Sequence, residues 1–462
     1  MPALDKLEKE HNSNRLSQLN DALESGMFLQ VRTMLNQLPT ADIAHMLEST
    51  PPKARKILWR LVDSDKEGEV LQFLNEDLLN AFAVKMQPAE LAAATAKLDT
   101  DDLADILGDL PNKITQEVLA SLGTQDRTRI EQALQYPEDT AGGLMNTDTI
   151  AVRPAITIEV VLRYLRVQKK LPKNTDSIYV VDTHDRLVGS VFLSTLITSQ
   201  PDQMVDEVVN QQIEAIPAAL PDTDVASLFE RHDLVSAPVV DDQGKLLGRI
   251  TIDDVLDVII EDADHSLMSM AGLDENDDTF APVFTSAKRR ALWLGINLIT
   301  VMLAASLIGL FEETIQAVAV LAVLLPIVPS MGGIAGTQSL TLVIRGMSIG
   351  HITGKNFRWL VFKELGVSLL NGIIWALVVG LSAYYWYLNT DKYETYAIGL
   401  GLSIGGAMMI NLIAGAIFGA ILPMVLTKMK IDPALSGGVI LTTVTEMIGF
   451  ISFLGLATIL VI

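Results

Sequence analysis

Residues 431–455 read IDPALSGGVILTTVTEMIGFISFLG. This stretch is long and apolar enough to cross a membrane, since about 20 such residues span the hydrocarbon core. Glu446 lies about half way along it, after Thr442 and Thr443, and Asp432 stands at its entrance. A carboxylate inside a bilayer is costly unless it faces water, a partner or a cation. We interpret Glu446 as part of a cation pathway; the alternative is a protonated Glu446 that hydrogen-bonds to a neighbouring helix.

The composition divides the chain into two unlike parts. Hydrophobic residues make up 49% of its 462 residues, yet the net charge is −22. Seven of the 56 Asp and Glu and ten of the 34 Lys and Arg follow Val283, so the net charge is −25 before Val283 and +3 after it. We expect an acidic soluble region joined to a membrane domain. The acidity argues against nucleic-acid binding and favours cations, unless it is only a solvated, self-repelling surface.

Several functional classes lack their signatures in this sequence. There is no cysteine, which excludes disulfides and thiolate metal sites, and the six histidines give no set of soft ligands for zinc or copper. No P-loop or HExxH motif occurs, so an enzyme is not expected. The N-terminus, MPALDKLEKEHNSNRL, has no apolar signal core, which predicts that the soluble region stays in the cytoplasm.

Residues 1–136 have the apolar spacing of stacked amphipathic helices. A weak internal repeat aligns LPTADIAHML with LDTDDLADIL and places Thr40 over Thr100 and Pro51 over Pro111. Each threonine reads as an N-cap before a helix. We therefore expect an all-α superhelical N-domain.

The densest acid cluster of this N-domain consists of Asp99, Asp101, Asp102, Asp105 and Asp109. In a helix, Asp101, Asp105 and Asp109 share one face, where like charges repel mildly. A divalent ion or a basic partner would neutralise that repulsion. Simple exposure of the acids explains the cluster equally well.

Two similar segments follow, YVVDTHDRLVGSV at 179–191 and PVVDDQGKLLGRI at 238–250. Each reads as a strand, a polar turn and a second strand, with a helix after it. The pattern resembles a tandem CBS pair, a small α/β module that often senses adenine nucleotides or ions. We expect its repeats at residues 137–200 and 201–258. ATP binding by the pair stays open, because the sequence locates no nucleotide pocket.

Residues 259–286 read as a connecting helix with an acidic side, and a membrane domain follows at 287–462. Its five predicted α-helical spans lie at about 291–311, 315–343, 360–387, 396–426 and 432–461. Basic residues gather on one side of these spans: Lys288, Arg289, Arg290, Arg345, Lys355, Arg358, Lys428 and Lys430. The positive-inside rule then predicts a cytoplasmic N-terminus and an external C-terminus.

The other spans also carry glycines and polar residues. In the second span, Pro326, Pro329 and several glycines permit a broken helix or close helix contact. Small-residue packing alone would explain the glycines. It does not explain the polar residues that recur on other spans: Thr337, Gln338, Ser339, Lys363, Glu364, Asn371 and Asn411.

The order of these parts, over essentially the whole chain, resembles the MgtE family of magnesium channels. The matching motifs are PEDTAGGLM at Pro137, DDVLDV at Asp253, MGGIAGTQS at Met331, KELGVSLLNG at Lys363 and DPALSGGVILTTVTE at Asp432. The resemblance implies a homodimer with a Mg²⁺-selective pore at the dimer axis, closed when cytosolic Mg²⁺ is abundant. It also implies that the connecting helix acts as a plug.

The family pattern also implies ligands. Glu446, Thr442 and Thr443 would bind the ion in the pore. The regulatory cytosolic set would be Asp102, Asp105, Gly142 through its backbone, Glu230, Asp233, Asp254, Asp257, Asp262 and Asp432. The chain departs from the family at Ile334 and Thr337, where many members have Asn, at Glu446, commonly Asp, and at His265 and Ser266, usually an acidic pair.

The chemistry of Mg²⁺ agrees with this interpretation. Mg²⁺ takes octahedral oxygen ligands and gives up water reluctantly, and two symmetry-related Glu446 carboxylates with threonine hydroxyls can hold it through its waters. The prediction is channel-like uptake across the cytoplasmic (inner) membrane. Two alternatives remain: a gradient-driven transporter of Mg²⁺, Mn²⁺ or Co²⁺ in which Glu446 titrates, and a membrane-bound sensor regulated through the CBS pair. The sequence does not separate Mg²⁺ from Mn²⁺, Co²⁺ or Ca²⁺.

Overall fold

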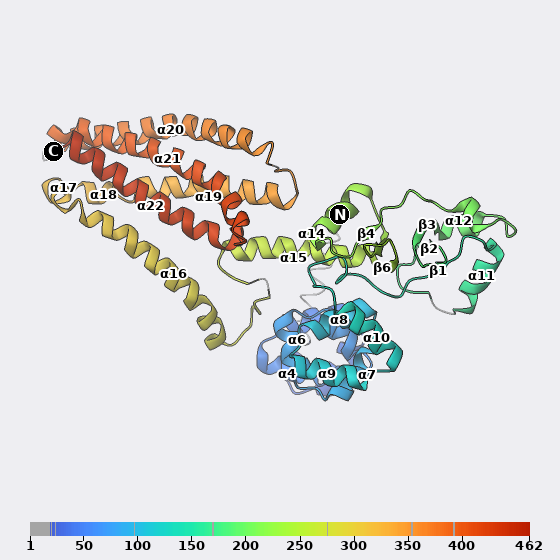
Figure 1. Cartoon of the computed structure of the whole chain (residues 1–462). Coiled ribbons are helices and arrows are strands. Elements are labelled where there is room, and N and C mark those ends of the chain that lie inside the picture. Colours follow the sequence, from blue (N-terminus) through green and yellow to red (C-terminus); the bar gives the residue numbers. More distant parts are fainter. Residues whose placement is uncertain are drawn as a thin grey trace. The chain divides into compact units, whose positions relative to one another are not determined.

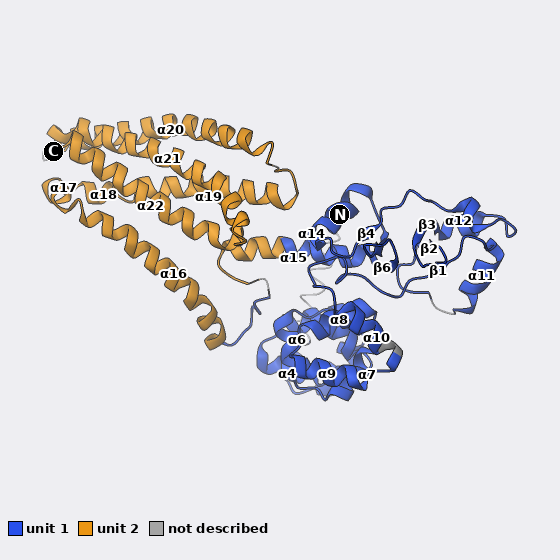
Figure 2. Cartoon of the chain, viewed as in Figure 1, with its two compact units in different colours: residues 1–262, 276–282 blue, residues 263–275, 283–462 orange. Residues whose placement is uncertain are grey.

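The computed structural model describes residues 19, 21–23, 25–96, 98–168, 171–274, 276–352, 354–390 and 393–462, except for the side chains of residues 125 and 126. The chain forms two compact units (Figure 2). Unit 1 comprises Met1–Asp262 and Asn276–Pro282, and unit 2 comprises Ala263–Glu275 and Val283–Ile462. The change in charge predicted at Val283 therefore coincides with a structural division.

Short helices form the first part of unit 1 (Figure 1). They are α2 Phe28–Asn36, α3 Thr40–Glu48, α4 Pro52–Trp59, α5 Glu67–Gln72, α6 Glu76–Ala83, α7 Pro88–Thr95, α8 Thr100–Gly108, α9 Asn112–Ser121 and α10 Thr124–Ala133. Their apolar faces share one core. The helical N-domain predicted from the sequence is confirmed.

The internal repeat corresponds to the helix pairs α3–α4 and α8–α9. Pro51 and Pro111 hold the same place, immediately before the second helix of each pair. The predicted caps are displaced by one residue, because Thr40 and Thr100 are already the first helical residues. Asp99 holds the N-cap position of α8, and its side chain makes no capping hydrogen bond.

Two three-stranded sheets follow, each ordered so that the second strand lies between the first and the third. The first repeat contains β1 Ala151–Val152, α11 Ile158–Val167, β2 Ser177–Val181, β3 Leu187–Phe192, α12 Leu193–Thr198 and α13 Val205–Val208. The second contains β4 Ile216–Pro217, α14 Asp222–His232, β5 Ser236–Val240 and β6 Leu246–Thr251. The predicted hairpins β2–β3 and β5–β6 are antiparallel, and each is followed by a helix. The short first strands, β1 and β4, pair in parallel and were not predicted.

An aspartate closes each hairpin in the same way. The Asp182 carboxylate accepts backbone hydrogen bonds from His184 and Arg186, at 2.8 and 2.9 Å. The Asp241 carboxylate accepts the equivalent bonds from Gln243 and Lys245. This turn chemistry explains why both copies have an aspartate directly after the first strand of the hairpin, β2 or β5.

The predicted connecting helix and the last helix of the second repeat are one helix, α15 Ile252–Met270. It buries Val255 and Val258 in the core of that repeat. The helix begins seven residues before the predicted start at 259 and ends well before 286, because Gly272 adopts a positive φ of 71° just after it. The described residues between Gly272 and Val283 form no helix.

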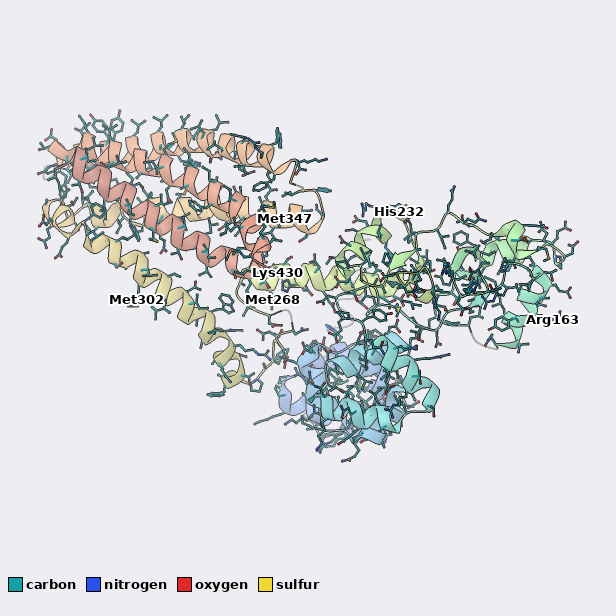
Figure 3. All side chains as sticks on the ribbon, viewed as in Figure 1. Arg163, His232, Met268, Met302, Met347 and Lys430 are labelled. Atoms are coloured by element: carbon teal, nitrogen blue, oxygen red, sulfur yellow. The ribbon has the colours of Figure 1, made fainter. Side chains whose placement is uncertain are left out.

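Within its described residues, unit 2 has five helical stretches long and apolar enough to span a membrane: Val283–Gly309, Leu321–Ser348, Phe357–Leu388, Glu394–Lys428 and Pro433–Leu460. The helices are α16 Val283–Gly309, α17 Glu312–Ala317, α18 Leu321–Leu324, α19 Ile327–Ser348, α20 Phe357–Leu388, η1 Glu394–Tyr396, α21 Ala397–Lys428 and α22 Pro433–Leu460. The predicted number of spans is confirmed. The first starts eight residues early, since its helix continues through the basic residues that the prediction excluded. Along it, apolar side chains such as Met302 are exposed (Figure 3).

Helix α21 packs against α19, α20 and α22. Small residues allow the backbones of α19 and α21 to approach closely: a Cβ added at Gly419 would lie 2.3 Å from the carbonyl oxygen of Gly336. The break predicted in the second span lies between α18 and α19, at Leu325 and Pro326. Both expectations for the second span, a broken helix and close helix contact, are met.

Candidate functional site

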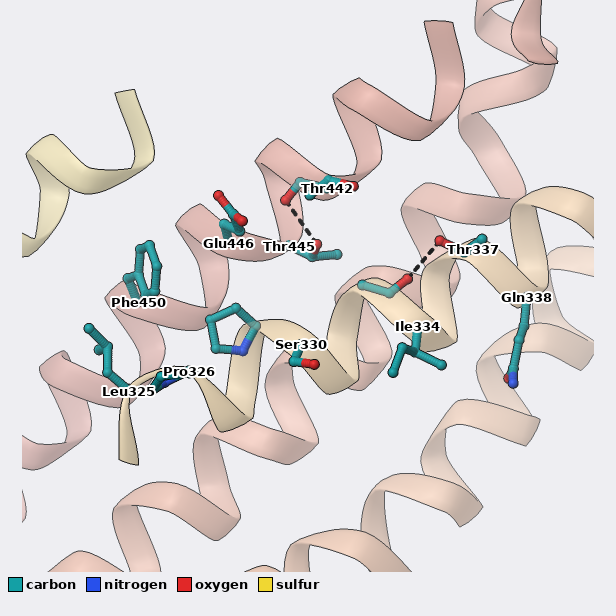
Figure 4. A pocket seen from close by; sticks show the side chains of 12 residues that line it. Leu325, Pro326, Ser330, Ile334, Thr337, Gln338, Thr442, Thr445, Glu446 and Phe450 are labelled. Carbon is teal, nitrogen blue, oxygen red and sulfur yellow. Dashed lines mark hydrogen bonds between the residues drawn. The ribbon is translucent and has the colours of Figure 1, made fainter. Parts of the chain in front are cut away.

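A cavity of about 710 Å³ lies within unit 2, between the α18–α19 segment and α22 (Figure 4). Its lining residues are Leu325, Pro326, Pro329, Ser330, Gly333, Ile334, Thr337, Gln338, Thr442, Thr445, Glu446 and Phe450. The cavity therefore joins the two segments in which the sequence places its unusual polar residues.

Glu446 is the one carboxylate among the residues that line the cavity. It is half-buried, and no hydrogen bond or ion pair of its side chain is found within the part of the chain that the structure describes. Thr442 lies one turn before it on α22 and Phe450 one turn after it (Figure 4). An ionisable group in an apolar helix that faces a cavity, with no partner among the described residues, suits a passing cation or water.

The threonine hydroxyls use their protons within their own helices. Thr442 Oγ1 donates to Gly438 O and Thr337 Oγ1 donates to Gly333 O, both at 2.9 Å. Each hydroxyl oxygen therefore keeps its lone pairs for another donor or for a cation. The cavity thus presents oxygen acceptors from both walls beside one carboxylate.

The structure separates the two threonines that the sequence assigned to the site. Thr442 lines the cavity together with Glu446, whereas Thr443 does not, and its hydroxyl donates to Val439 O at 2.8 Å. Sequence reasoning missed Ser330 and Phe450 and left Thr445 out of the ion-binding set. The four-residue spacing from Glu446 to Thr442 and to Phe450 was a usable signal, because residues at i and i+4 share a helix face. The two residues at family departures on α19, Ile334 and Thr337, also line the cavity.

Asp432 caps α22. Its carboxylate accepts backbone hydrogen bonds from Ala434 and Leu435, at 2.9 and 3.1 Å. His265 Nε2 lies 3.4 Å from Asp432 Oδ2. The aspartate that was predicted as a regulatory ligand is therefore engaged as a helix cap and by the histidine that departs from the family pattern.

The remaining intramembrane polar residues lie outside the cavity. Glu364 is buried and accepts hydrogen bonds from Ser339 Oγ at 2.7 Å and Lys363 Nζ at 2.6 Å. Asn371 is exposed. Asn411 is buried on α21 and donates to the backbone of α19.

In unit 1, the acids of α8 meet those of α15. Burial and the neighbouring carboxylates raise the pKa of Asp105 to about 8 and that of Asp254 to about 7. Burial raises the pKa of Asp102 to about 6, although Lys173 opposes the rise. Asp101, for which the sequence left simple exposure and neutralisation by an ion or a basic partner equally open, is buried, and burial with the nearby Asp254 raises its pKa well above its usual value. Burial, together with the negative charge of neighbouring carboxylates, therefore makes each of these carboxyl groups harder to ionise.

The other predicted regulatory residues are more dispersed. Glu230 and Asp233 are exposed near the C-terminal end of α14, where Asp233 has a left-handed backbone. Burial and the charge of Asp253 raise the pKa of Asp257. The charge of Asp262 contributes, after burial, to a raised pKa at Asp222.

Gly142 lies in a tight place, because its N–H donates to Ala218 O at 2.9 Å and a Cβ there would lie 2.4 Å from the Tyr136 ring. Among the described residues, no three His, Asp or Glu side chains are close enough together to hold one metal ion. The structure thus gathers the acids of α8 and α15 without completing a ligand set around a single point.

Comparison with known families matches the N-domain, the CBS pair and the membrane domain from residue 325 onward. The MgtE family, described as divalent cation transporters, matches residues 325–456. The MgtE intracellular N domain matches residues 38–139, and the CBS domain matches 141–202 and 205–261.

Two curated relatives align over nearly the full length. The magnesium transporter MgtE of Thermus thermophilus is 30% identical over 447 residues, covering 96% of this chain and 97% of the relative. The magnesium transporter MgtE of Bacillus subtilis is 28% identical over 442 residues, covering 94% and 95%. Among solved structures, a cytosolic domain of the Mg²⁺ channel MgtE in complex with ATP is 32% identical, covers 53% of this chain and 99% of that chain, and has a TM-score of 0.49.

Proposed function

Since the chain belongs to the MgtE family of magnesium transporters, we propose that it takes up Mg²⁺ through the membrane by a channel-like pathway past Glu446. The observation that carries this proposal is the half-buried Glu446 carboxylate, without a partner in the described part of its chain, in a cavity of about 710 Å³. Its curated relatives are named as transporters, a function that is not enzymatic.

Each side chain of the cavity has a role in this proposal. The Glu446 carboxylate attracts the cation and accepts hydrogen bonds from its water shell. The oxygens of Thr442 and Thr337 accept from other waters of the shell, because their own protons are already donated to the helix backbones. Mg²⁺ keeps its waters readily, so a site that holds it through water binds it weakly enough to release it. Thr443 is not part of the ion-binding set in this proposal, because it does not line the cavity.

A second copy of the chain completes the pathway. Thr337, Thr442 and Ile334 are exposed in the single chain although they lie within apolar helices. Polar side chains within a membrane face protein or water rather than lipid. A homodimer in which two such cavities meet would place two Glu446 carboxylates around one path and remove the threonines from lipid.

The soluble acids serve as the regulatory element. With the N-terminal domains in the cytoplasm and the C-terminus outside, cytosolic Mg²⁺ binds among Asp102, Asp105, Gly142, Glu230, Asp233, Asp254, Asp257, Asp262 and Asp432 and closes the pathway. Support comes from the raised pKa values of Asp102, Asp105 and Asp254, since carboxylates that repel one another gain most from a bridging cation. ATP binding at the CBS pair stays a prediction.

The test is Mg²⁺ influx into liposomes that contain the purified protein. A channel gives flux that follows the Mg²⁺ gradient and the voltage alone. Flux that requires a proton or sodium gradient at fixed voltage would instead identify a coupled transporter with Glu446 as the titrating group. Absence of Mg²⁺ flux under every gradient would refute the proposal.

A further inference from the structure

Asn411 is a fully buried amide on α21, behind the candidate cavity. Its Nδ2 donates a hydrogen bond to the backbone oxygen of Val328 on α19, at 2.8 Å. Its Oδ1 has no hydrogen-bond partner among the described atoms of the chain. The orientation of the amide follows from this bond, because the reverse orientation would place two acceptor oxygens against each other.

Both walls of the cavity touch this amide through glycine. A Cβ added at Gly332 of α19 would lie 2.1 Å from Asn411 Nδ2, and one added at Gly449 of α22 would lie 3.1 Å from the same atom. The neighbouring residues Gly333 on α19 and Phe450 on α22 line the cavity. On each wall, the glycine that contacts the amide is therefore the sequence neighbour of a residue that lines the cavity.

Asn411 contacts the first turn of α19, which its own hydrogen bonds hold least firmly, since the first N–H groups of a helix have no partner within it. Pro326 is the N-cap of α19 and Pro329 is its third residue. The Asn411 bond to Val328 fixes the backbone between these prolines. An unpaired buried acceptor is unfavourable for stability, and an apolar side chain of the same size would avoid it. The position of the amide, rather than packing alone, explains a polar residue here.

We propose that Asn411 is a positioning residue of the ion pathway, which sets the separation of α19 and α22 and thereby the opening beside Glu446. The inference rests on the proposed function, because it assigns to this opening the choice between Mg²⁺, which keeps its water shell, and Ca²⁺, which exchanges waters for protein oxygens more readily. Asn411 acts through the helices and does not touch the ion.

The test compares Asn411→Leu with Ser403→Ala. Ser403 is an equally buried polar residue of the same helix whose hydroxyl has no hydrogen-bond partner in the described structure, so it is a matched control. Mg²⁺ and Ca²⁺ influx are measured in liposomes, and the melting temperature is recorded. We expect the ratio of Mg²⁺ to Ca²⁺ flux to fall at least about fivefold in Asn411→Leu and to stay constant in Ser403→Ala. A purely structural defect would lower both fluxes in proportion and leave the ratio unchanged.

A distance measurement gives a readout that does not need transport. The chain has no cysteine, so spin labels attach only at Leu342→Cys on α19 and Ile451→Cys on α22, both exposed positions outside the cavity lining. Leu340 lies against Gly437 and Pro329 lies against Gly449, so the helices are antiparallel. Position 342 is then level with residue 435, and the labels lie about 24 Å apart along the helices. Labelled chains are diluted with unlabelled protein so that distances within one chain dominate. We expect the distance distribution to shift or broaden in Asn411→Leu and in Gly332→Ala, which presses a methyl group against the amide.

An unchanged flux ratio or an unchanged distance in folded Asn411→Leu overturns the inference. Failure of both Asn411→Leu and Gly332→Ala to fold also overturns it, because Asn411 would then stabilise the whole domain rather than position the cavity walls. If the unsubstituted protein carries no Mg²⁺, the proposed function fails, and the label distances alone decide the role of Asn411.

Discussion

Two adjacent threonines of α22 provide a sharp test of the site at the level of single residues. Thr442 lines the cavity and Thr443 does not, yet both hydroxyls donate to a backbone oxygen of their own helix one turn earlier. Thr442→Ala removes an oxygen from the path and should lower Mg²⁺ influx severalfold, whereas Thr443→Ala should leave influx unchanged. Equal losses in the two variants would contradict the assignment of the cavity wall.

Glu446→Gln tests the charge at the centre of the site. The substitution keeps the size of the side chain and removes the negative charge that attracts the cation, so we expect Mg²⁺ influx to fall at least about tenfold. Folding should be preserved, since Glu446 makes no ion pair within the described part of the chain. Size-exclusion chromatography checks the assembly, and undiminished influx would remove Glu446 from the pathway.

Arg55 forms a buried ion pair within unit 1. Its guanidinium holds Asp278 through two bonds, Nη1–Oδ2 at 2.7 Å and Nη2–Oδ1 at 3.0 Å, and the two side chains are only 5% and 7% exposed. Arg55→Met leaves the Asp278 carboxylate buried without its partner, which costs about 3 kcal/mol of stability. Hydrogen exchange of α4 amides in the full chain measures the loss.

The control is Arg32→Met, which breaks the exposed pair with Asp63. Exposed ion pairs contribute less than about 1 kcal/mol, so this variant should exchange almost as the unsubstituted protein does. Equal protection of α4 in both variants would show that the Arg55–Asp278 pair does not hold residues 276–282 to the N-domain.

At the level of elements, the meeting of α8 and α15 should depend on pH. Asp102, Asp105 and Asp254 have folded-state pKa values of about 6, 8 and 7, all above the value of about 4 for an unfolded aspartate. Such groups favour the folded state most fully below about pH 4, and this contribution is lost as the pH rises through the folded values. Without divalent ions, protection of α8 from hydrogen exchange should therefore weaken between about pH 5 and pH 8.5.

Two additions separate this effect from general instability. Asp105→Asn should flatten the pH dependence, whereas Asp224→Asn, at an exposed site on α14, should not. Millimolar Mg²⁺ at pH 8 should restore the protection of α8, because a cation offsets the charge that protonation removes at low pH. If the protection of α8 from hydrogen exchange did not change with pH, the charges of these acids would not control the contact between α8 and α15.

At the level of the whole molecule, the proposed regulation predicts that inhibition by Mg²⁺ requires the acidic soluble region. Removing all residues before Ser286 should leave Mg²⁺ influx and abolish its inhibition by Mg²⁺ on the soluble side. In the full chain, protease protection of α15 and the N-domain should rise over the same Mg²⁺ range in which influx falls. Full inhibition of the truncated protein would place the gate within the membrane domain.

The sequence by itself determined most of the elements and their order, although it did not indicate the short parallel strands β1 and β4. The period of the apolar residues gives the helices of the N-domain and the five spans, and the Asp182 and Asp241 turns give the two hairpins, because these signals are local to the chain. Local signals also indicated Glu446, since a carboxylate inside a span is unusual wherever the span packs. The predictions from the sequence were wrong in detail at the threonine caps and at the ends of α15. Both errors concern helix ends, which depend on tertiary contacts and on single glycines.

Only the tertiary structure decided which polar groups meet. The packing of α19 against α22 selects Thr442 over Thr443 for the cavity, and the packing of α21 places Asn411 behind both walls. The burial of Asp101 also depends on tertiary packing. The bond between Arg55 and Asp278 joins residues far apart in the chain. Such pairings depend on which faces of different elements pack together. The apolar periodicity of one element predicts its buried face but not which element packs against that face. The sequence thus determined which side chains each helix carries, and the tertiary structure determined which side chains of other elements they contact.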